Sequence, residues 1–216
     1  MKEKNTKRNE VPKRPLLEEI GNAITHGVGT LLAIWGFIMM LIKSDTPLEV
    51  ISAVIYFVGL CILFTMSCLY HAFPNKLKVK KLFRRFDYLS IYLLIGATYT
   101  PILLLQFGDS FGVWFCVIQW VIIATGITFI GIFGPGKLKW LHFPLYIILG
   151  WCGLLFLPDL FSNNFYLFIF ILAGGVVYSL GIIPFVMKKN VAHFIWHFFV
   201  LFGAIIHFLG IYFYLY

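Results

Sequence analysis

Apolar runs of about 20 residues recur along the chain, and a run of that length crosses a hydrocarbon core of roughly 30 Å as a helix. Lipid offers the backbone no hydrogen-bonding partner, so spanning segments of this kind must satisfy their own polar groups. The chain is 61% hydrophobic and 12% charged, whereas about a quarter of a soluble domain is charged. We therefore predict an all-α integral membrane protein, a seven-transmembrane helix bundle, with spans at roughly 22–42, 48–70, 86–107, 111–133, 141–157, 166–187 and 192–213.

The basic residues predict the orientation of this bundle. Of the 17 Lys and Arg residues, 16 lie in the N-terminal tail or in alternate loops, and the opposite loops carry Lys43 alone. Cytoplasmic loops are the ones enriched in Lys and Arg, so we expect the N-terminus in the cytoplasm and the C-terminus outside. Residues 1–21 would form a basic cytoplasmic tail and 22–216 the membrane domain. The 16 residues are Lys2, Lys4, Lys7, Arg8, Lys13, Arg14, Lys76, Lys78, Lys80, Lys81, Arg84, Arg85, Lys137, Lys139, Lys188 and Lys189.

The net charge of +8 follows from this distribution. Basic residues placed in this way orient the protein in the membrane and attract anionic lipid headgroups. The charge therefore does not indicate a nucleic-acid partner. The four cysteines lie in apolar spans without a C-x-x-C pair, so they are expected as small core residues with no redox role. They are Cys61, Cys68, Cys116 and Cys152.

Five polar residues lie at a similar depth in the membrane when the spans are oriented in this way. Ser67 and His71 lie at the cytoplasmic end of the second span, and Asp87 lies in the first turn of the third. His193 and His197 lie within about two turns of the cytoplasmic start of the seventh span, at a rise of 1.5 Å per residue. Residues more than 120 positions apart in the sequence are therefore expected to form one site.

Three histidines with a carboxylate and a hydroxyl suit a transition metal, most plausibly zinc. Imidazole is a preferred zinc ligand, and catalytic zinc keeps three protein ligands and one open position. His193 and His197 are one helical turn apart, so both rings can reach one point, and His71 from another helix would complete the set. Ionisable residues inside a membrane indicate function by default.

Each of these residues also has a simpler interpretation. Asp87 could cap its helix or interact with the helix dipole, and Ser67 could bond the carbonyl four residues back. His71 could anchor the interface, and His193 and His197 could form interhelical hydrogen bonds. The shared depth of all five favours a metal site.

Four segments carry a resemblance to a known family. "EEIGNAITHGVG" (18–29) is similar to an opening E-x-x-N-x-x-T-H segment, and "SCLYH" (67–71) to S-x-x-x-H. "FDYLSIYLLIGATYTP" (86–101) is similar to the signature of helix three, with "GATYTP" where many members have A-G-T-Y-T-P, and "HFIWH" (193–197) to H-x-x-x-H. On these motifs the chain resembles the hemolysin III family. That family is the bacterial branch of the progestin and adipoQ receptor superfamily, which includes the adiponectin receptors.

The resemblance implies a seven-helix fold with zinc near the cytoplasmic face. It assigns zinc ligation to His71, His193 and His197. Asp87 would hold the zinc-bound water, and Ser67 would lie next to these groups without binding the zinc. The wider group includes alkaline ceramidases, which implies hydrolysis of a lipid amide. The bacterial branch is named for a pore-forming, cytolytic activity, which a compact helical membrane protein does not resemble.

The first span begins with a further polar group that could support the site or could simply be a polar helix start. Its members are Glu18, Asn22, Thr25 and His26. His142, beside Trp140, is expected as an interfacial anchor, and His207, near mid-bilayer, as a residue hydrogen-bonded within the bundle.

Three classes of function are compatible with these features. The first is a zinc-dependent membrane hydrolase acting on a lipid or acyl amide. The second is a non-enzymatic receptor or lipid sensor in which zinc is structural, with Cys68 as the candidate fourth ligand. The third is a pore-forming cytolysin, which would need polar residues through the whole bilayer. Retinal binding is disfavoured because the seventh span has no lysine, and a receptor coupled to G proteins would have its N-terminus outside.

Overall fold

Helices account for nearly all of the computed structural model, which describes residues 10–187 and 189–216 and contains no strand within those ranges. Six helices are long and apolar enough to cross a membrane. They are α2 (Leu16–Lys43), α3 (Pro47–Ala72), α4 (Lys78–Pro101), α5 (Ser110–Phe133), α8 (Phe165–Val186) and α9 (Ala192–Tyr214). Lys2, Lys4, Lys7, Arg8 and Lys188 lie outside the described residues. The all-α membrane bundle expected from the apolar runs is confirmed.

The fifth expected span is broken into two helices. Helix α6 (Lys139–Trp151) and helix α7 (Leu157–Asn163) are joined by a 3₁₀ turn, Cys152–Leu155, and are bent by 42° relative to each other. At 1.5 Å per residue, α6 alone is about 20 Å long, too short for a core of roughly 30 Å. Within residues 10–187 and 189–216, six helices are therefore long and apolar enough to span a membrane, or seven when the bent pair is counted as one span.

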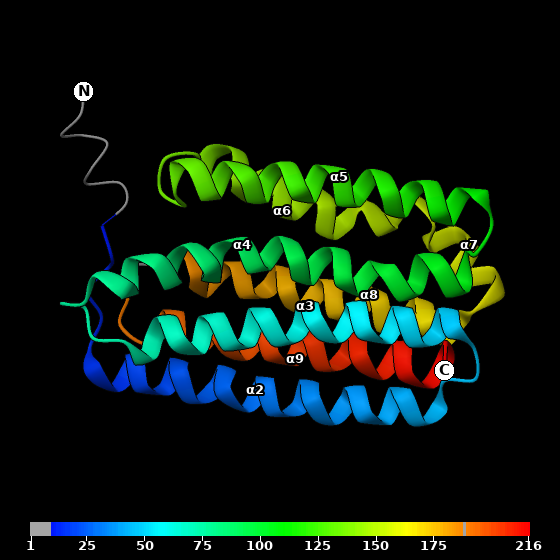
Figure 1. Ribbon diagram of the computed structural model, residues 1–216, viewed down its shortest axis with the longest axis horizontal. Coiled ribbons are helices and arrows are strands. Elements are labelled where there is room, and N and C mark those ends of the chain that lie inside the picture. Colours follow the sequence, from blue (N-terminus) through cyan, green and yellow to red (C-terminus); the bar gives the residue numbers. More distant parts are fainter. Residues whose placement is uncertain (1–9, 188) are drawn as a thin grey trace.

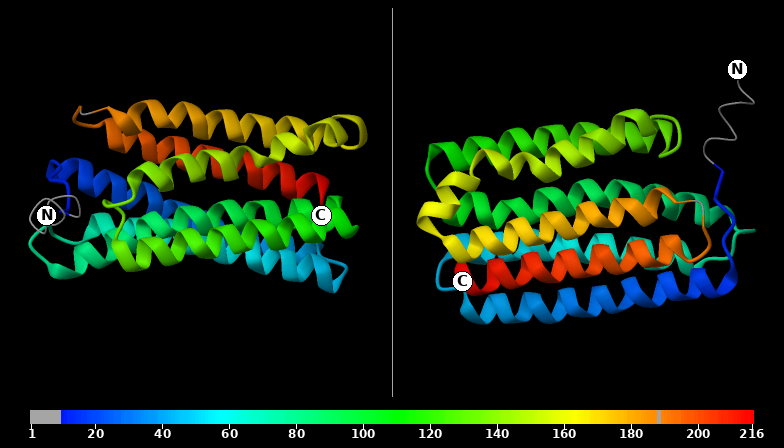
Figure 2. Two further views of the ribbon diagram at one scale, coloured as in Figure 1. Left: turned by 90° about the horizontal axis from the view of Figure 1, so that it is seen from above. Right: turned by 180° about the vertical axis from the view of Figure 1, so that it is seen from behind.

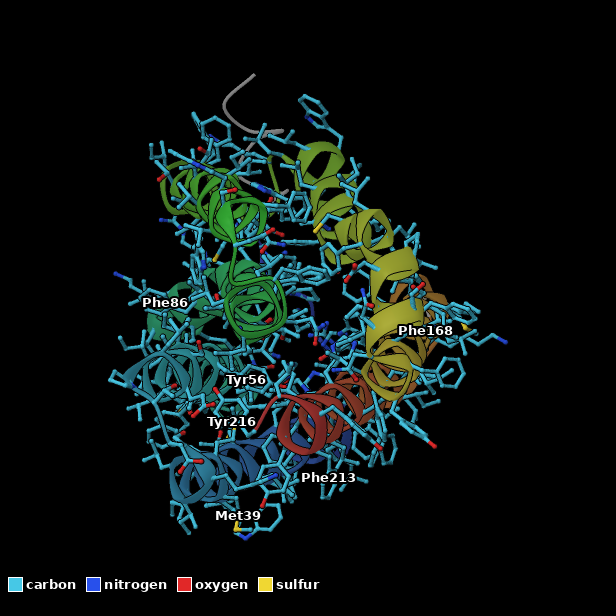
Figure 3. All side chains as sticks on the ribbon, turned by 90° about the vertical axis from the view of Figure 1, so that its right-hand side faces the viewer. Met39, Tyr56, Phe86, Phe168, Phe213 and Tyr216 are labelled. Atoms are coloured by element: carbon cyan, nitrogen blue, oxygen red, sulfur yellow. The ribbon has the colours of Figure 1, made fainter. Side chains whose placement is uncertain are left out.

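The long helices run nearly parallel to one another (Figures 1 and 2). Consecutive helices α2, α3 and α4 pack side by side, α8 packs against α9, and α2 packs against α9. The first and last helices therefore close the bundle. Seen end-on, the helices surround an interior into which nitrogen-bearing side chains project (Figure 3).

Helices α3 and α4, which carry Ser67, His71 and Asp87, approach closely because Gly59 of α3 has no side chain. A Cβ atom at Gly59 would overlap the Cβ atom of Ala97 on α4. The two backbones can therefore lie nearer than any larger residue would allow, as at other small-residue contacts in membranes.

Helix α4 begins at Lys78, within the basic segment 74–85 that was expected to be a loop. Lys80 and Arg84 lie four residues apart, so they share a helix face, and that face is buried at 1% and 3% exposure. Asp87 is consequently the tenth residue of α4. The prediction that Asp87 lies in the first turn is wrong, and so is the alternative that it caps the helix.

The segment before α2 crosses the end of the bundle at which α4 begins. Arg84 Nη1 donates a hydrogen bond to the Glu10 carbonyl at 2.9 Å, and Arg14 Nη1 donates to the Tyr70 hydroxyl at 3.4 Å. Helix α2 starts at Leu16, so the expected tail 1–21 is helical from that residue on. These contacts fix the chain next to the polar residues described below.

Candidate metal centre

Three histidines from two helices form a cluster at this end of the bundle. His71 lies one residue before the end of α3, His193 is the second residue of α9, and His197 follows one turn later. One potential ligand atom from each lies within 4.8 Å of the others. His71 and His197 are 3% and 2% exposed. The convergence expected from the topology is present, and the cluster could hold a metal ion.

The ring nitrogens of these histidines fit such an ion. His71 Nε2, His193 Nε2 and His197 Nδ1 are buried and have no hydrogen-bond partner among the described residues. A buried polar atom without a partner costs free energy, and a coordinated cation would remove that cost. Neutral imidazole is also what zinc binds. The donor set therefore suits zinc.

Glu19 and Asn22, on one face of α2, contact the other nitrogen of His71. Glu19 Oε2 lies 2.6 Å from His71 Nδ1, and Asn22 Nδ2 lies 3.3 Å from the same atom. Lys80 Nζ donates to Glu19 Oε1 at 3.0 Å. Glu19, which was not among the residues predicted from the sequence, is thus the carboxylate at His71. The sequence pattern could have indicated Glu19, because E-x-x-N-x-x-T-H fits this chain when its first residue is Glu19.

Glu18 supports the start of α9 instead. Its Oε2 accepts a hydrogen bond from the Val191 N–H at 3.2 Å, and its Oε1 lies 4.0 Å from Arg14 Nε. Val191 has φ = 70°, a left-handed conformation that is unfavourable for a β-branched residue. Because Val191 directly precedes α9, this contact fixes the first turn, which carries His193.

His26 is a fourth buried histidine beside the cluster. Its ring stacks on that of His197, with centroids 3.8 Å apart and planes inclined by 22°. Both of its ring nitrogens lack a hydrogen-bond partner in the described part of the chain. Stacked rings direct their nitrogens side by side rather than at one point, so His26 supports the face of His197 and is not placed as a ligand.

Asp87 and Ser67 form a second polar pair close to the histidines. The Ser67 hydroxyl, on α3, lies near the Asp87 carboxylate, on α4. Both residues line the same cavity as His193 and His197. A carboxylate that faces a cavity next to a metal-binding cluster can act on a molecule bound there.

The cavity has a volume of about 350 Å³ and extends from this polar end into the bundle. His207, ten residues beyond His197 on α9, also lines it, which corresponds to a length of about 15 Å. Between these ends the wall is largely apolar, with side chains from α4, α6, α8 and α9. They include Ile91, Leu94, Ile95, Ile147, Trp196 and Val200. The cavity suits a molecule with a polar end and a long apolar part.

The remaining candidates lie apart from the histidine cluster. Thr25 donates back to the Gly21 carbonyl of its own helix at 2.7 Å. His142 was expected as an interfacial anchor but is 2% exposed, because its Nδ1 pairs with the Tyr92 hydroxyl of α4 at 2.9 Å. His207 Nε2 bonds the Ile171 carbonyl at 3.1 Å, as expected for a residue paired within the bundle.

Cys68 was the candidate fourth ligand of a structural metal site. Its sulfur faces Gly27 of α2. Within the described residues, the cluster of potential ligands consists of the three histidines without Cys68.

Comparison with known proteins places the whole fold in one family. The family model described as "Haemolysin-III related" matches residues 15–208. "Hemolysin-3" of Bacillus cereus is 37% identical over 219 positions, covering 99% of this chain and 97% of that protein. "Hemolysin-3 homolog" of Bacillus subtilis is 34% identical, covering 91% and 94%. "Monocyte to macrophage differentiation factor" of Homo sapiens is 32% identical, covering 92% and 85%. With its six or seven apolar helices, the chain is a multi-pass cell membrane protein and belongs to the haemolysin-III related family.

Proposed function

We propose that this protein is a zinc-dependent hydrolase that cleaves a lipid or acyl amide within the membrane. The observation that carries the proposal is the position of the histidine cluster. Three imidazoles with buried, unpartnered nitrogens lie together, and two of them, His193 and His197, line the polar end of a long, largely apolar cavity. The basic residues near this end lead us to infer that it faces the cytoplasm.

Under this proposal His71, His193 and His197 hold zinc as neutral ligands. Zinc, when bound, lowers the pKa of a coordinated water toward 7 and polarises a carbonyl oxygen. Asp87 takes the proton of the attacking water and delivers it to the leaving nitrogen. Ser67, which lies near Asp87, would orient its carboxylate by donating a hydrogen bond to it. The new C–O bond forms as the C–N bond breaks, giving a carboxylic acid and an amine.

The shape of the cavity supports a lipid substrate. Pockets that bind small molecules are largely apolar and carry a few polar groups that fix orientation, and here Asp87, His193 and His197 gather at one end. The scissile amide would lie beside Asp87 and the histidines, and an acyl chain would extend toward His207. The surrounding apolar walls would exclude bulk water from the reacting atoms.

The composition of the cluster favours this function over a structural metal site. Structural zinc is normally held by four protein ligands, whereas catalytic zinc has three and an open position. The described residues provide three histidines, and two of them, His193 and His197, line the same cavity as Asp87. The names of the Bacillus relatives suggest haemolysis. A pore would need polar groups along the whole bundle, whereas the cavity lining between the histidine cluster and His207 is largely apolar.

The test is metal analysis followed by an activity assay on the purified protein. We expect about one zinc per chain and slow release of fatty acid from a panel of N-acyl lipids in detergent or vesicles. Treatment with a chelator should abolish release, and added zinc should restore it. Protein that binds zinc but hydrolyses none of the panel would support the receptor alternative, and protein without zinc would contradict the metal centre.

A further inference from the structure

The His71 imidazole has two different environments at its two nitrogens. Nδ1 lies 2.6 Å from Glu19 Oε2, while Nε2 is buried with no hydrogen-bond partner among the described residues. Glu19 is 6% exposed and His71 is 3% exposed, so bulk water does not screen this contact. The carboxylate therefore acts on one specific nitrogen of a candidate metal ligand.

The short contact determines the tautomer of His71. An ionised carboxylate only accepts hydrogen bonds, and two acceptors at 2.6 Å would repel each other. The proton must therefore be on Nδ1, which leaves the lone pair on Nε2. Asn22 Nδ2 lies farther away, at 3.3 Å from Nδ1, and as a donor it cannot bond to a protonated Nδ1, so Glu19 is the acceptor for this N–H.

Lys80 holds the Glu19 carboxylate in place. Its ammonium donates to Glu19 Oε1 at 3.0 Å, it is 1% exposed, and it lies 5.2 Å from the centroid of the Tyr70 ring. The two oxygens of Glu19 thus have separate partners, His71 on α3 and Lys80 on α4. Burying Lys80 without a carboxylate would be costly, so the pair is well defined. Lys78 and Lys81, which lie near Lys80 on α4, are exposed and do not contact Glu19.

We propose that Glu19 is a positioning residue for the metal: with Lys80 it fixes the Nδ1–H tautomer and the ring orientation of His71, so that Nε2 faces the ion. Ligating histidines commonly donate their second N–H to a carboxylate, which orients the ring and makes the ligand more basic. This inference rests on the proposed zinc site. It adds helix α2 to the metal centre, which the histidines alone confine to α3 and α9.

The test is the zinc affinity of purified variants, measured by competition with a chromophoric chelator. We expect Glu19→Ala to bind zinc about 10 to 100 times more weakly than wild type, the usual effect of removing such a partner. Glu19→Gln alone leaves the Lys80 ammonium unpaired. The double variant Glu19→Gln/Lys80→Met restores an accepting oxygen without that charge and should bind more tightly than Glu19→Ala. Glu10→Ala and Lys81→Met are matched controls with exposed side chains and should bind as wild type.

The outcomes separate this inference from the proposed function. Wild-type protein without zinc would overturn both. Wild-type affinity in Glu19→Ala would overturn the positioning role alone and leave the metal centre intact. If Glu19→Ala fails to fold, the visible spectrum of the cobalt-substituted Glu19→Gln protein decides. A role at the metal should shift the ligand-field bands relative to wild type, and unchanged bands would contradict the proposal.

Discussion

The rings of His26 and His197 are stacked 3.8 Å apart, which joins the first long helix of the bundle to the last. His26 also meets the edge of the Phe64 ring at 5.1 Å. The face of the His197 imidazole is thereby covered, and its rotation about the side-chain bonds is restricted. We therefore expect His26 to support the candidate metal centre by holding the His197 ring, without binding an ion itself.

A first prediction concerns this stack. His26→Phe keeps a flat ring of similar size and should retain zinc with little change in affinity. His26→Ala removes the ring, leaves a void beside His197 and should weaken zinc binding while lowering the thermal stability of the metal-free protein. Metal content and melting temperature of the purified variants measure both effects. Complete loss of zinc in His26→Phe would indicate that a nitrogen of His26 is itself a ligand.

A second prediction concerns the ligands. His193→Ala combined with His197→Ala removes two of the three imidazoles and should abolish stoichiometric zinc binding. His142→Ala and His207→Ala should retain about one zinc per chain, because both lie outside the cluster of three histidines and one nitrogen of each pairs within the bundle, with Tyr92 and with the Ile171 carbonyl. Elemental analysis after size-exclusion chromatography provides the measurement. Stoichiometric zinc in the double variant would contradict the ligand assignment.

A third prediction separates catalysis from structure at Asp87. Asp87→Asn keeps the size of the side chain and removes its basicity. If Asp87 serves as the base, the variant should fold and hold zinc, yet hydrolyse the amide at least on the order of a hundredfold more slowly. Zinc content and the rate of fatty-acid release should be measured on the same preparation. A loss of zinc would make Asp87 a direct ligand, and an unchanged rate would exclude it as the base.

A fourth prediction is the orientation of the bundle. A reporter fused after Tyr216 should respond as an external domain. A cysteine label introduced into segment 74–77, before α4, should react only with reagents that enter the cytoplasm. Spheroplasts treated with permeant and impermeant reagents provide the comparison. An internal C-terminus would place the metal centre at the outer face.

A fifth prediction concerns the contact between α3 and α4. Gly59→Ala would force the new methyl group against Ala97 and should lower the free energy of unfolding by roughly 1–3 kcal/mol, the usual cost of overpacking. Gly131 lies in α5, and no atom lies within 4 Å of the point that a methyl group would occupy there, so Gly131→Ala should raise stability by about 0.5–1 kcal/mol. Thermal unfolding in one detergent compares the two directly. Equal melting temperatures would mean that α3 and α4 separate easily.

The sequence predicted the parts of this structure that depend on local composition and on topology. The spans follow from apolar length, and the meeting of His71 with His193 and His197 follows once the loops are assigned to sides. Both inferences require only the position of a residue along its helix. Neither requires the rotation of a helix about its axis.

The relationships that were missed depend on that rotation or on pairing between helices. The choice between Glu18 and Glu19 is a rotation of about 100° on α2, and only the packed structure shows which one contacts His71. The burial of Lys80 was hidden because its neighbours make the segment look like a solvated basic loop. Its partner, Glu19, lies 61 positions away.

Val191, in its left-handed conformation, fixes the residue at which α9 begins and with it the rotation of the helix about its axis. Because Glu18 holds the N–H of this residue, α9 cannot begin one position earlier or later without losing that anchor. Each such shift would turn the helix by about 100° and point His193 and His197 away from His71. The candidate metal centre therefore depends on the length of the connection between α8 and α9. This connection should tolerate insertions far less than the turn that joins α2 to α3.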